Sequence, residues 1–222
     1  MKKLLSITAL LMTAVLFFSS CSNASGGSDS GPSLPGSWTS SINYFDPIQT
    51  EKWTRDAGNL TYKWNKSASE EGVTSWIPLT NDQIYGVKVK MKQKVFTEAE
   101  IGIYLYEDGD YKDNTDSYYA LYLWKGSYIL KEKLSGQTVT YLSGDGVYSN
   151  TWNDAIKEEG NENTVLFYTD GDNLVLKING TEIKRFKNKL STGLCNATMS
   201  IPKKAAGNIE ASWSFVDFQT KK

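Results

Sequence analysis

The stretch NTVLFYTDGDNLVLKING, residues 163–180, decides the fold class. Every second residue is apolar on both sides of the Asp170–Asp172 turn, which is the period-two pattern of a half-buried β-strand. Asn179-Gly180 then separates this stretch from a further run with apolar residues, and Asn-Gly in that position is the strongest short hairpin signal. The stretch therefore predicts three consecutive antiparallel strands, at Thr164–Tyr168, Asn173–Ile178 and Thr181–Phe186.

The same pattern continues on both sides of this stretch, with turn residues between short apolar runs. Further strands are expected at Val87–Lys92, Ile101–Tyr106, Tyr118–Trp124, Tyr128–Lys133, Ala197–Ile201 and Ile209–Phe218. One helical turn is expected, near Asn153–Glu158. About ten short strands in one domain, without the alternating helices that a parallel sheet requires, predict an all-β sandwich or barrel.

The order of these segments resembles the concanavalin A-like jelly rolls, the superfamily of laminin-G-like modules, legume-type lectins and many glucanases. Besides residues 163–180, the resemblance rests on Phe45-Asp46 followed by Trp53 (opening strand), Tyr118–Leu121 leading to Tyr128–Leu130 (central hairpin) and Trp213–Phe218 (closing strand). It implies an all-β, two-sheet antiparallel jelly-roll sandwich over residues 38–222. It also implies that a bound sugar lies on the concave face. Another type of β-sandwich is the alternative.

Alternation places a group of aromatic rings on one face of the strands at 101–106 and 118–124. If the aliphatic residues of these strands face the core, five rings share the opposite face. They are Tyr104, Tyr106, Tyr118, Tyr122 and Trp124. Flat rings with polar tips suit the apolar faces of sugars, so these residues are the predicted ligand-binding site. Two alternatives are that the tyrosines point inward, and that a loop covers the outward rings.

An acidic loop joins the two aromatic strands. Its carboxylates at Asp108, Asp110, Asp113 and Asp116 are candidate Ca²⁺ ligands, because calcium prefers several oxygen ligands on a flexible loop and members of the resembled superfamily often carry this ion. The loop is not an EF-hand, since its glycine is misplaced and no Glu closes it at the twelfth position. A solvated turn without metal is the alternative.

The residue types needed for several kinds of catalysis are missing from the sequence. The chain has no histidine, which excludes Ser-His-Asp and Cys-His nucleophile systems and the usual zinc sites. Retaining glucanases of the resembled superfamily carry Glu-x-Asp-x-x-Glu, whereas the nearest candidate here is Glu98-Ala99-Glu100. We therefore expect a non-catalytic, lectin-like domain that binds carbohydrate or another extracellular ligand. The alternatives are a glycoside-cleaving enzyme and a structural or protein-interaction module.

The first 20 residues have the order of a secretory signal, with Lys2-Lys3 followed by an apolar run and small polar residues. Phe18-Ser19-Ser20-Cys21 resembles the lipobox of bacterial lipoproteins, which implies cleavage before Cys21 and lipidation of that cysteine. Such acylation would anchor the chain in a membrane, and Ser22 after the cysteine implies the outer membrane. The alternative is ordinary secretion with cleavage near Ala24.

The residues after Cys21 are rich in Ser, Gly and Pro up to Ser37, which is the composition of a flexible tether. We therefore divide the chain into a signal peptide (1–20), a lipidated tether (21–37) and one β-sandwich domain (38–222). The net charge of −1 becomes about −3 when the two lysines of the signal are removed, so no nucleic-acid partner is expected. The row Lys88, Lys90, Lys92 and Lys94 is interpreted as a solvated outer face.

Overall fold

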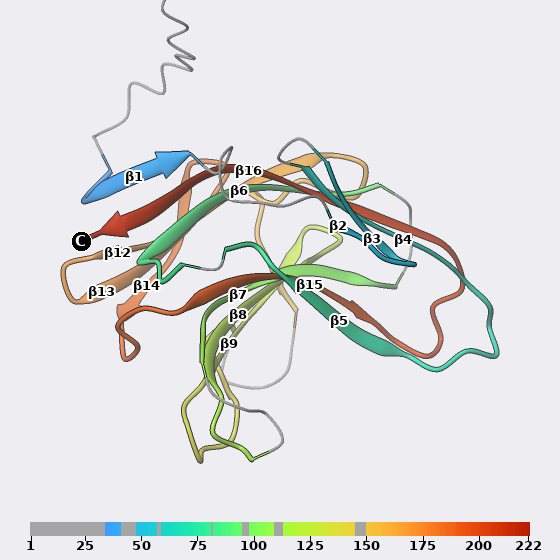
Figure 1. Ribbon diagram of the computed structural model, residues 1–222, viewed down its shortest axis with the longest axis horizontal. Helices are drawn as coiled ribbons and strands as arrows, with labels where there is room; N and C mark the ends of the chain where they lie inside the picture. Colours follow the sequence, from blue (N-terminus) through green and yellow to red (C-terminus); the bar gives the residue numbers. More distant parts are fainter. Residues whose placement is uncertain are drawn as a thin grey trace, which may run out of the picture. The chain divides into compact units, whose positions relative to one another are not determined.

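The computed structural model describes residues 34–40, 48–56, 59–80, 82–94, 98–108, 113–144 and 150–222. In these ranges the chain forms strands, turns and loops but no helix, which confirms the all-β class (Figure 1). Near Asn153–Glu158, where one helical turn was expected, the chain forms a single hydrogen-bonded turn that is not part of a helix. The Ile156 N–H donates to the Asn153 carbonyl in this turn. A helix with the length and apolar character of a membrane span does not occur in the described ranges.

The first sheet has the strand order β14-β13-β12-β6-β16-β4-β3-β2, with β1 added beside β16, and its pairings are antiparallel. Its strands are β1 (Ser37–Ser40), β2 (Ile48–Gln49), β3 (Trp53–Asp56), β4 (Asn59–Lys66), β6 (Gly86–Gln93), β12 (Glu162–Asp170), β13 (Asn173–Ile178), β14 (Thr181–Lys187) and β16 (Gly207–Lys221). Asn179 and Gly180 both have positive φ at the β13–β14 turn, as the Asn-Gly signal predicts.

The second sheet has the order β10-β9-β8-β7-β15-β5, with β11 added beside β9, and is also antiparallel. Its strands are β5 (Val73–Pro78), β7 (Glu100–Asp108), β8 (Ser117–Trp124), β9 (Ser127–Lys133), β10 (Thr140–Tyr141), β11 (Thr151–Trp152) and β15 (Leu194–Ile201). In Figure 1 this sheet lies below the first one, with β7, β8 and β9 beneath β6 and β16. The two layers form the predicted sandwich.

One hydrophobic core fills the space between the sheets. Trp213 of β16 is fully buried and stacks at 5.3 Å, centroid to centroid, on Trp53 of β3. Its indole N–H donates to the carbonyl of Gly102 in β7 at 3.0 Å, and therefore joins the two sheets directly. Cys195 is fully buried in the same core, as a small apolar residue would be.

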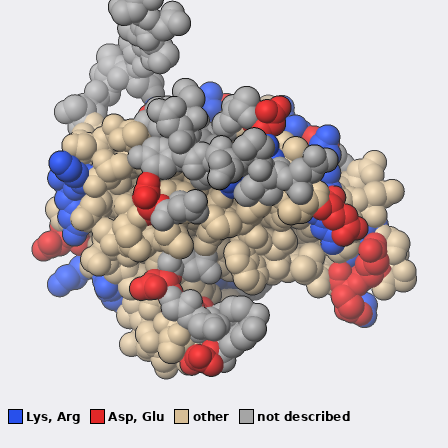
Figure 2. Space-filling model, viewed as in Figure 1, with Lys and Arg blue, Asp and Glu red and all other residues tan. Residues whose placement is uncertain are grey.

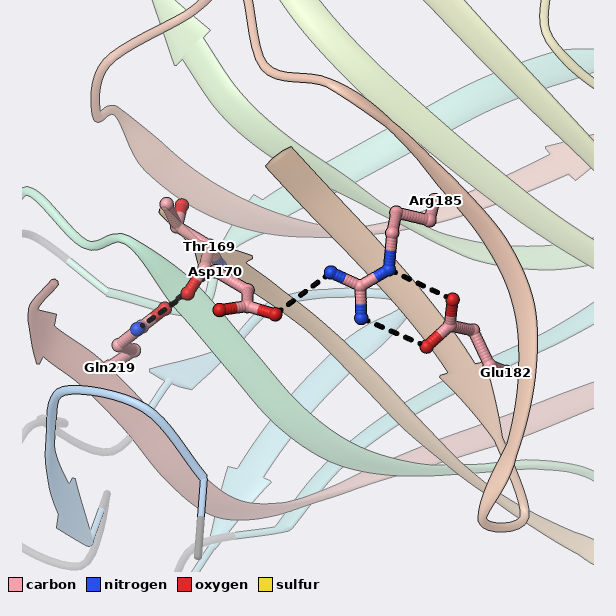
Figure 3. A network of polar contacts seen from close by, with 5 residues as sticks. All are labelled: Thr169, Asp170, Glu182, Arg185 and Gln219. Atoms are coloured by element: carbon pink, nitrogen blue, oxygen red, sulfur yellow. Dashed lines mark hydrogen bonds and ion pairs between the residues drawn. The ribbon is translucent and has the colours of Figure 1, made fainter. Parts of the chain in front are cut away.

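The compact unit runs from Pro35 to the C-terminus, and its two ends lie side by side. The buried side chain of Gln219 donates to the carbonyls of Pro35 and Thr169 and accepts from the Thr169 N–H. Figure 3 shows this contact beside Arg185, which bridges Asp170 and Glu182. The segment before Pro35 therefore joins the domain at the end of the first sheet that carries the β12–β13 turn.

Charges of both signs are mixed on the surface. Figure 2 shows basic and acidic side chains interspersed toward the ends of the domain. In the lysine row of β6, Lys90 pairs with Glu162 at 3.2 Å, and Lys94, just after the strand, pairs with Glu210 at 3.0 Å. The lysine row thus lies on an outer face whose charge is partly balanced by neighbouring acids.

Candidate functional site

The outer face of the second sheet carries four of the five predicted rings: Tyr104 on β7, and Tyr118, Tyr122 and Trp124 on β8. The aliphatic residues between them face the core, as alternation predicts. The face assignment is therefore confirmed for these four. Whether they bind a ligand remains a prediction.

The prediction that Tyr106 belongs to the ligand-binding rings is wrong, because its side chain lies in the core. Its φ of 61° coincides with a register shift between Leu105 and Asp108, and this bulge turns the side chain to the opposite side of the sheet. Only 1% of the residue is exposed, and its hydroxyl contacts the Thr169 hydroxyl at 2.6 Å and donates to the Tyr85 carbonyl. Burial raises the pKa of Tyr106 far above its ordinary value. Its role is structural.

The outer tyrosines pack edge to face against one another. Tyr104 lies 4.8 Å from Tyr118 and 6.1 Å from Tyr122, centroid to centroid, and the Tyr104 and Tyr122 hydroxyls are hydrogen-bonded at 2.8 Å. Tyr122 is buried, and this burial raises its pKa to about 12. The tyrosines therefore form a floor whose rings largely cover each other, so they present less flat apolar surface than the sequence predicts.

Gly102 makes this packing possible. It lies between Thr198 of β15 and Tyr122 of β8, directly above the point where Trp213 joins the sheets. A Cβ atom there would lie 2.2 Å from the Leu121 carbonyl oxygen, which is closer than real contacts allow, and 3.0 Å from the Tyr122 ring, which is a tight contact. The missing side chain lets the Tyr122 ring lie close to the sheet.

Lys131 of β9 brings a cation onto the aromatic floor. Its Nζ is 4.7 Å from the centroid of the Tyr122 ring and 5.7 Å from that of Tyr141, within cation–π range. Burial lowers the pKa of Lys131, and the nearby carboxylate of Glu100 opposes this effect. The floor is thus aromatic with one half-buried ammonium group.

A cleft of about 220 Å³ opens beside this floor, at the end of β8. Its lining combines an indole with acidic, basic and hydroxyl groups: Glu98, Glu100, Trp124, Asn150, Ser200, Pro202 and Lys204. Trp124 is half-buried, and in the described part of the chain its indole N–H has no hydrogen-bond partner. This N–H is itself buried, so a ligand in the cleft would meet the exposed part of the Trp124 ring.

The carboxylate of Glu98 is engaged by two lysines. Its oxygens lie 3.4 Å from Nζ of Lys125 and 3.4 Å from Nζ of Lys204. Partial burial raises its pKa, but the two ammonium groups outweigh this and hold the pKa of Glu98 below its usual value. Glu98 therefore stays ionised in the neutral range.

Two exposed tryptophans on the second sheet were missed by sequence reasoning. Trp76 of β5 is 47% exposed and lies opposite Thr198, and Trp152 of β11 is 57% exposed and lies opposite Ser127. They therefore stand near opposite edges of this sheet. Alternation with buried Ile77 could have placed Trp76, whereas β11 is too short to show a period.

The acidic loop does not assemble a metal site in its described part. Asp108 and Asp113 are exposed, and Asp116 is buried in an ion pair with Lys133 of β9. Asp110 lies outside the described residues. Among the residues that are described, no group of three or more His, Cys, Asp or Glu side chains could hold a metal ion. The ion pair explains why Asp116 does not act as a metal ligand, since the ammonium group of Lys133 already balances the charge of its carboxylate.

Comparison with known proteins decides the fold. No protein-family model matches the chain, and no curated protein matches its sequence significantly. Among solved structures, an endo-1,3-β-glucanase (laminarinase) catalytic domain from Thermotoga petrophila aligns with a TM-score of 0.56 at 6% identity, over 78% of this chain and 82% of that chain. The κ-carrageenase of Zobellia galactanivorans aligns with a TM-score of 0.53 at 12% identity, over 86% and 98%. These alignments show that the domain has the fold of these neighbours, a two-sheet antiparallel jelly-roll sandwich.

A third jelly-roll neighbour is a β-1,3-1,4-glucanase (lichenase) derived from a mouse hindgut metagenome, with a TM-score of 0.51 at 11% identity, over 82% of this chain and 92% of that chain. Identities this low establish the shared jelly roll and nothing finer. In this jelly roll, Glu98 and Glu100 line one cleft two positions apart, before and at the start of β7. They are the carboxylates to test for catalysis.

Proposed function

We propose that the jelly roll binds a carbohydrate chain on the outer face of its second sheet, without cleaving it, and that lipid on Cys21 holds it at a membrane surface. The observation that carries the binding proposal is the Trp124 cleft. A half-buried indole lies there beside carboxylate, hydroxyl and ammonium groups, and sugars offer both apolar ring faces and hydroxyls to such a surface.

The fold neighbours support a carbohydrate as the ligand class. The named activities of the laminarinase, the carrageenase and the lichenase are directed at polysaccharides, and their domains share this architecture. The likeness alone does not transfer an activity. It agrees, however, with the half-buried Trp124 ring in the cleft, since aromatic rings pack against sugar rings.

The surroundings of Glu98 and Asp116 favour binding over cleavage by these two residues. A glycosidase needs one carboxyl group with a raised pKa, so that it can protonate the leaving oxygen. The pKa of Glu98 is lowered instead, by Lys125 and Lys204. Asp116 is neutralised by Lys133. Catalysis is the second candidate, because Glu98 and Glu100 share one cleft.

The membrane anchor is proposed from the sequence, since Cys21 lies outside the described residues. The chain enters the domain at Pro35, beside the β12–β13 turn, whereas the Trp124 cleft lies near the opposite end. The strand β13 spans this distance with six residues, or about 20 Å. Labelling with a radioactive fatty acid tests the anchor, because Cys21→Ser would abolish incorporation.

The binding proposal is tested with the full-length protein in detergent, by affinity electrophoresis in gels that contain laminarin, κ-carrageenan or mixed-linkage glucan. We expect retardation in at least one gel, and Trp124→Ala should weaken the interaction about tenfold or more. Release of new reducing ends, abolished by Glu100→Gln, would instead establish the enzyme. A folded protein that none of the polysaccharides retards would contradict carbohydrate binding.

A further inference from the structure

Trp152 is the most exposed large apolar side chain in the described part of the chain. It belongs to β11, a two-residue strand beside β9, and projects at the end of the domain that carries the β13–β14 turn. Single exposed apolar side chains are common on protein surfaces, so exposure alone does not distinguish Trp152. What distinguishes it is the way its ring is held and what surrounds it.

The Trp152 ring is held in one orientation by its neighbours. A Cβ atom on Gly126 would lie 2.5 Å from the ring, so only glycine permits this contact. The indole N–H donates to the Asp154 carboxylate at 2.8 Å, and the Asn153 N–H donates to the Gly126 carbonyl at 3.1 Å. An exposed ring that is already fixed loses little entropy when a ligand stacks on it.

The surroundings of this ring are polar. Trp152, Asn153, Asp154, Ala155 and Thr181 line an open hollow of about 530 Å³. The side chain of Asn179 donates to the Ala155 carbonyl at 2.7 Å and so fixes this loop to the β13–β14 turn. One flat ring with a carboxylate, an amide and a hydroxyl nearby matches a single sugar residue. An apolar protein interface would instead bury a larger patch.

Trp152 and Trp124 belong to one row across the sheet. Trp152 lies opposite Ser127, and Ser127 lies opposite Trp124, so the Cα atoms of the two tryptophans are two strands apart. Two strand spacings correspond to about 10 Å. That backbone distance exceeds one pyranose ring, and the Trp124 cleft and the Trp152 hollow share no lining residue, so a glycan chain must extend over more than two sugar residues to occupy both.

We propose that Trp152 is a second stacking platform, which engages one residue of a glycan chain while another residue of the same chain occupies the Trp124 cleft. This inference rests on the proposed function and adds a length requirement to it. The ligand is an oligosaccharide or polysaccharide that spans both indoles. A mono- or disaccharide reaches one of them.

The test is a chain-length series. Oligosaccharides from disaccharide to octasaccharide, prepared from the polysaccharide that retards the protein, are titrated calorimetrically into the full-length protein. Wild type is compared with Trp124→Ala, Trp152→Ala and the double variant. Trp152→Ala should leave disaccharide affinity within about twofold and weaken octasaccharide binding about tenfold. Trp152→Phe keeps an apolar ring and should recover part of the loss. Leu166→Ala, on the outer face of the first sheet, is the matched control.

The outcomes separate the two proposals. If Trp124→Ala weakens binding of every length while Trp152→Ala changes none, the second platform is wrong and the proposed function stands. If Trp152→Ala weakens the disaccharide as much as the octasaccharide, the length requirement is wrong. If the wild type binds no oligosaccharide, both proposals fail. Because Trp152 is exposed, its variants should keep the wild-type unfolding temperature, and Asp154→Ala, which releases the ring, provides an independent check.

Discussion

Replacing Lys66 by Met should strongly destabilise the domain. Lys66 ends β4 with only 1% of its surface exposed, and its ammonium group donates to three carbonyls. These belong to Ser67 at 3.3 Å, Glu70 at 2.7 Å and Lys203 at 2.9 Å. The contact to Lys203 joins the β4–β5 loop to the β15–β16 turn.

The magnitude follows from the acceptors that lose their donor. Each partly buried carbonyl that loses its donor costs at most about 1–3 kcal/mol, and the apolar Met side chain recovers part of this by burial. We expect a net loss of about 2–4 kcal/mol of unfolding free energy, which for a domain of this size lowers Tm by roughly 4–16 °C. Because Pro202 and Lys204 flank Lys203 and line the Trp124 cleft, glycan binding should weaken as well.

Urea unfolding followed by tryptophan fluorescence measures this loss. Lys63→Met is the matched control, since Lys63 lies on the same strand and its side chain is 67% exposed. Its Nζ lies 3.6 Å from the Glu210 carboxylate, which is a long and therefore weak ion pair. Its variant should change stability by less than about 0.5 kcal/mol. Equal stability of the two variants would refute the argument that the three carbonyls depend on Lys66.

Two further predictions concern pH and metal. Burial raises the pKa values of Tyr62, Tyr119 and Tyr122 to about 12, against about 10 in the unfolded chain. The contribution of these neutral phenols to stability is therefore complete below pH 10 and is lost as the pH rises towards 12. Tyrosinate absorbance and circular dichroism should therefore change together in that window, and full titration of all 13 tyrosines with an unchanged fold would contradict this. A chelator should leave Tm and glycan retardation unchanged, because the carboxylate of Asp116 is already paired with Lys133. A Tm that falls in chelator and recovers with calcium would instead support a calcium site at the acidic loop.

The sequence predicted the sheets well because alternation records burial directly. The strands from β6 to β9 and from β12 to β16 follow from it, and so does the outward face of Tyr104, Tyr118 and Tyr122. Short edge strands such as β10 and β11 carry too few residues to show a period. They were therefore not predicted, and neither was the exposure of Trp152.

Alternation failed at Tyr106 for a physical reason. A bulge adds one residue to a strand, and a shift of one residue exchanges the two faces. The positive φ of Tyr106 has no local marker such as Gly or Asn in the sequence. The ion pair of Asp116 with Lys133 was equally hidden, because the two residues meet only through the pairing of β8 with β9.

The predicted aromatic group therefore divides into parts with different physical roles. Tyr106 fills the core, and Tyr104 and Tyr122 satisfy each other's hydroxyls and lie as a floor over Gly102. A ring that is already packed has little surface left for a ligand, whereas Trp124 keeps part of its ring in an open cleft and Trp152 keeps an open face. Binding energy should therefore concentrate on the two indoles, as it does at interfaces where a few rigid aromatic side chains dominate. The tyrosine floor would then set the shape that a glycan chain must match between them.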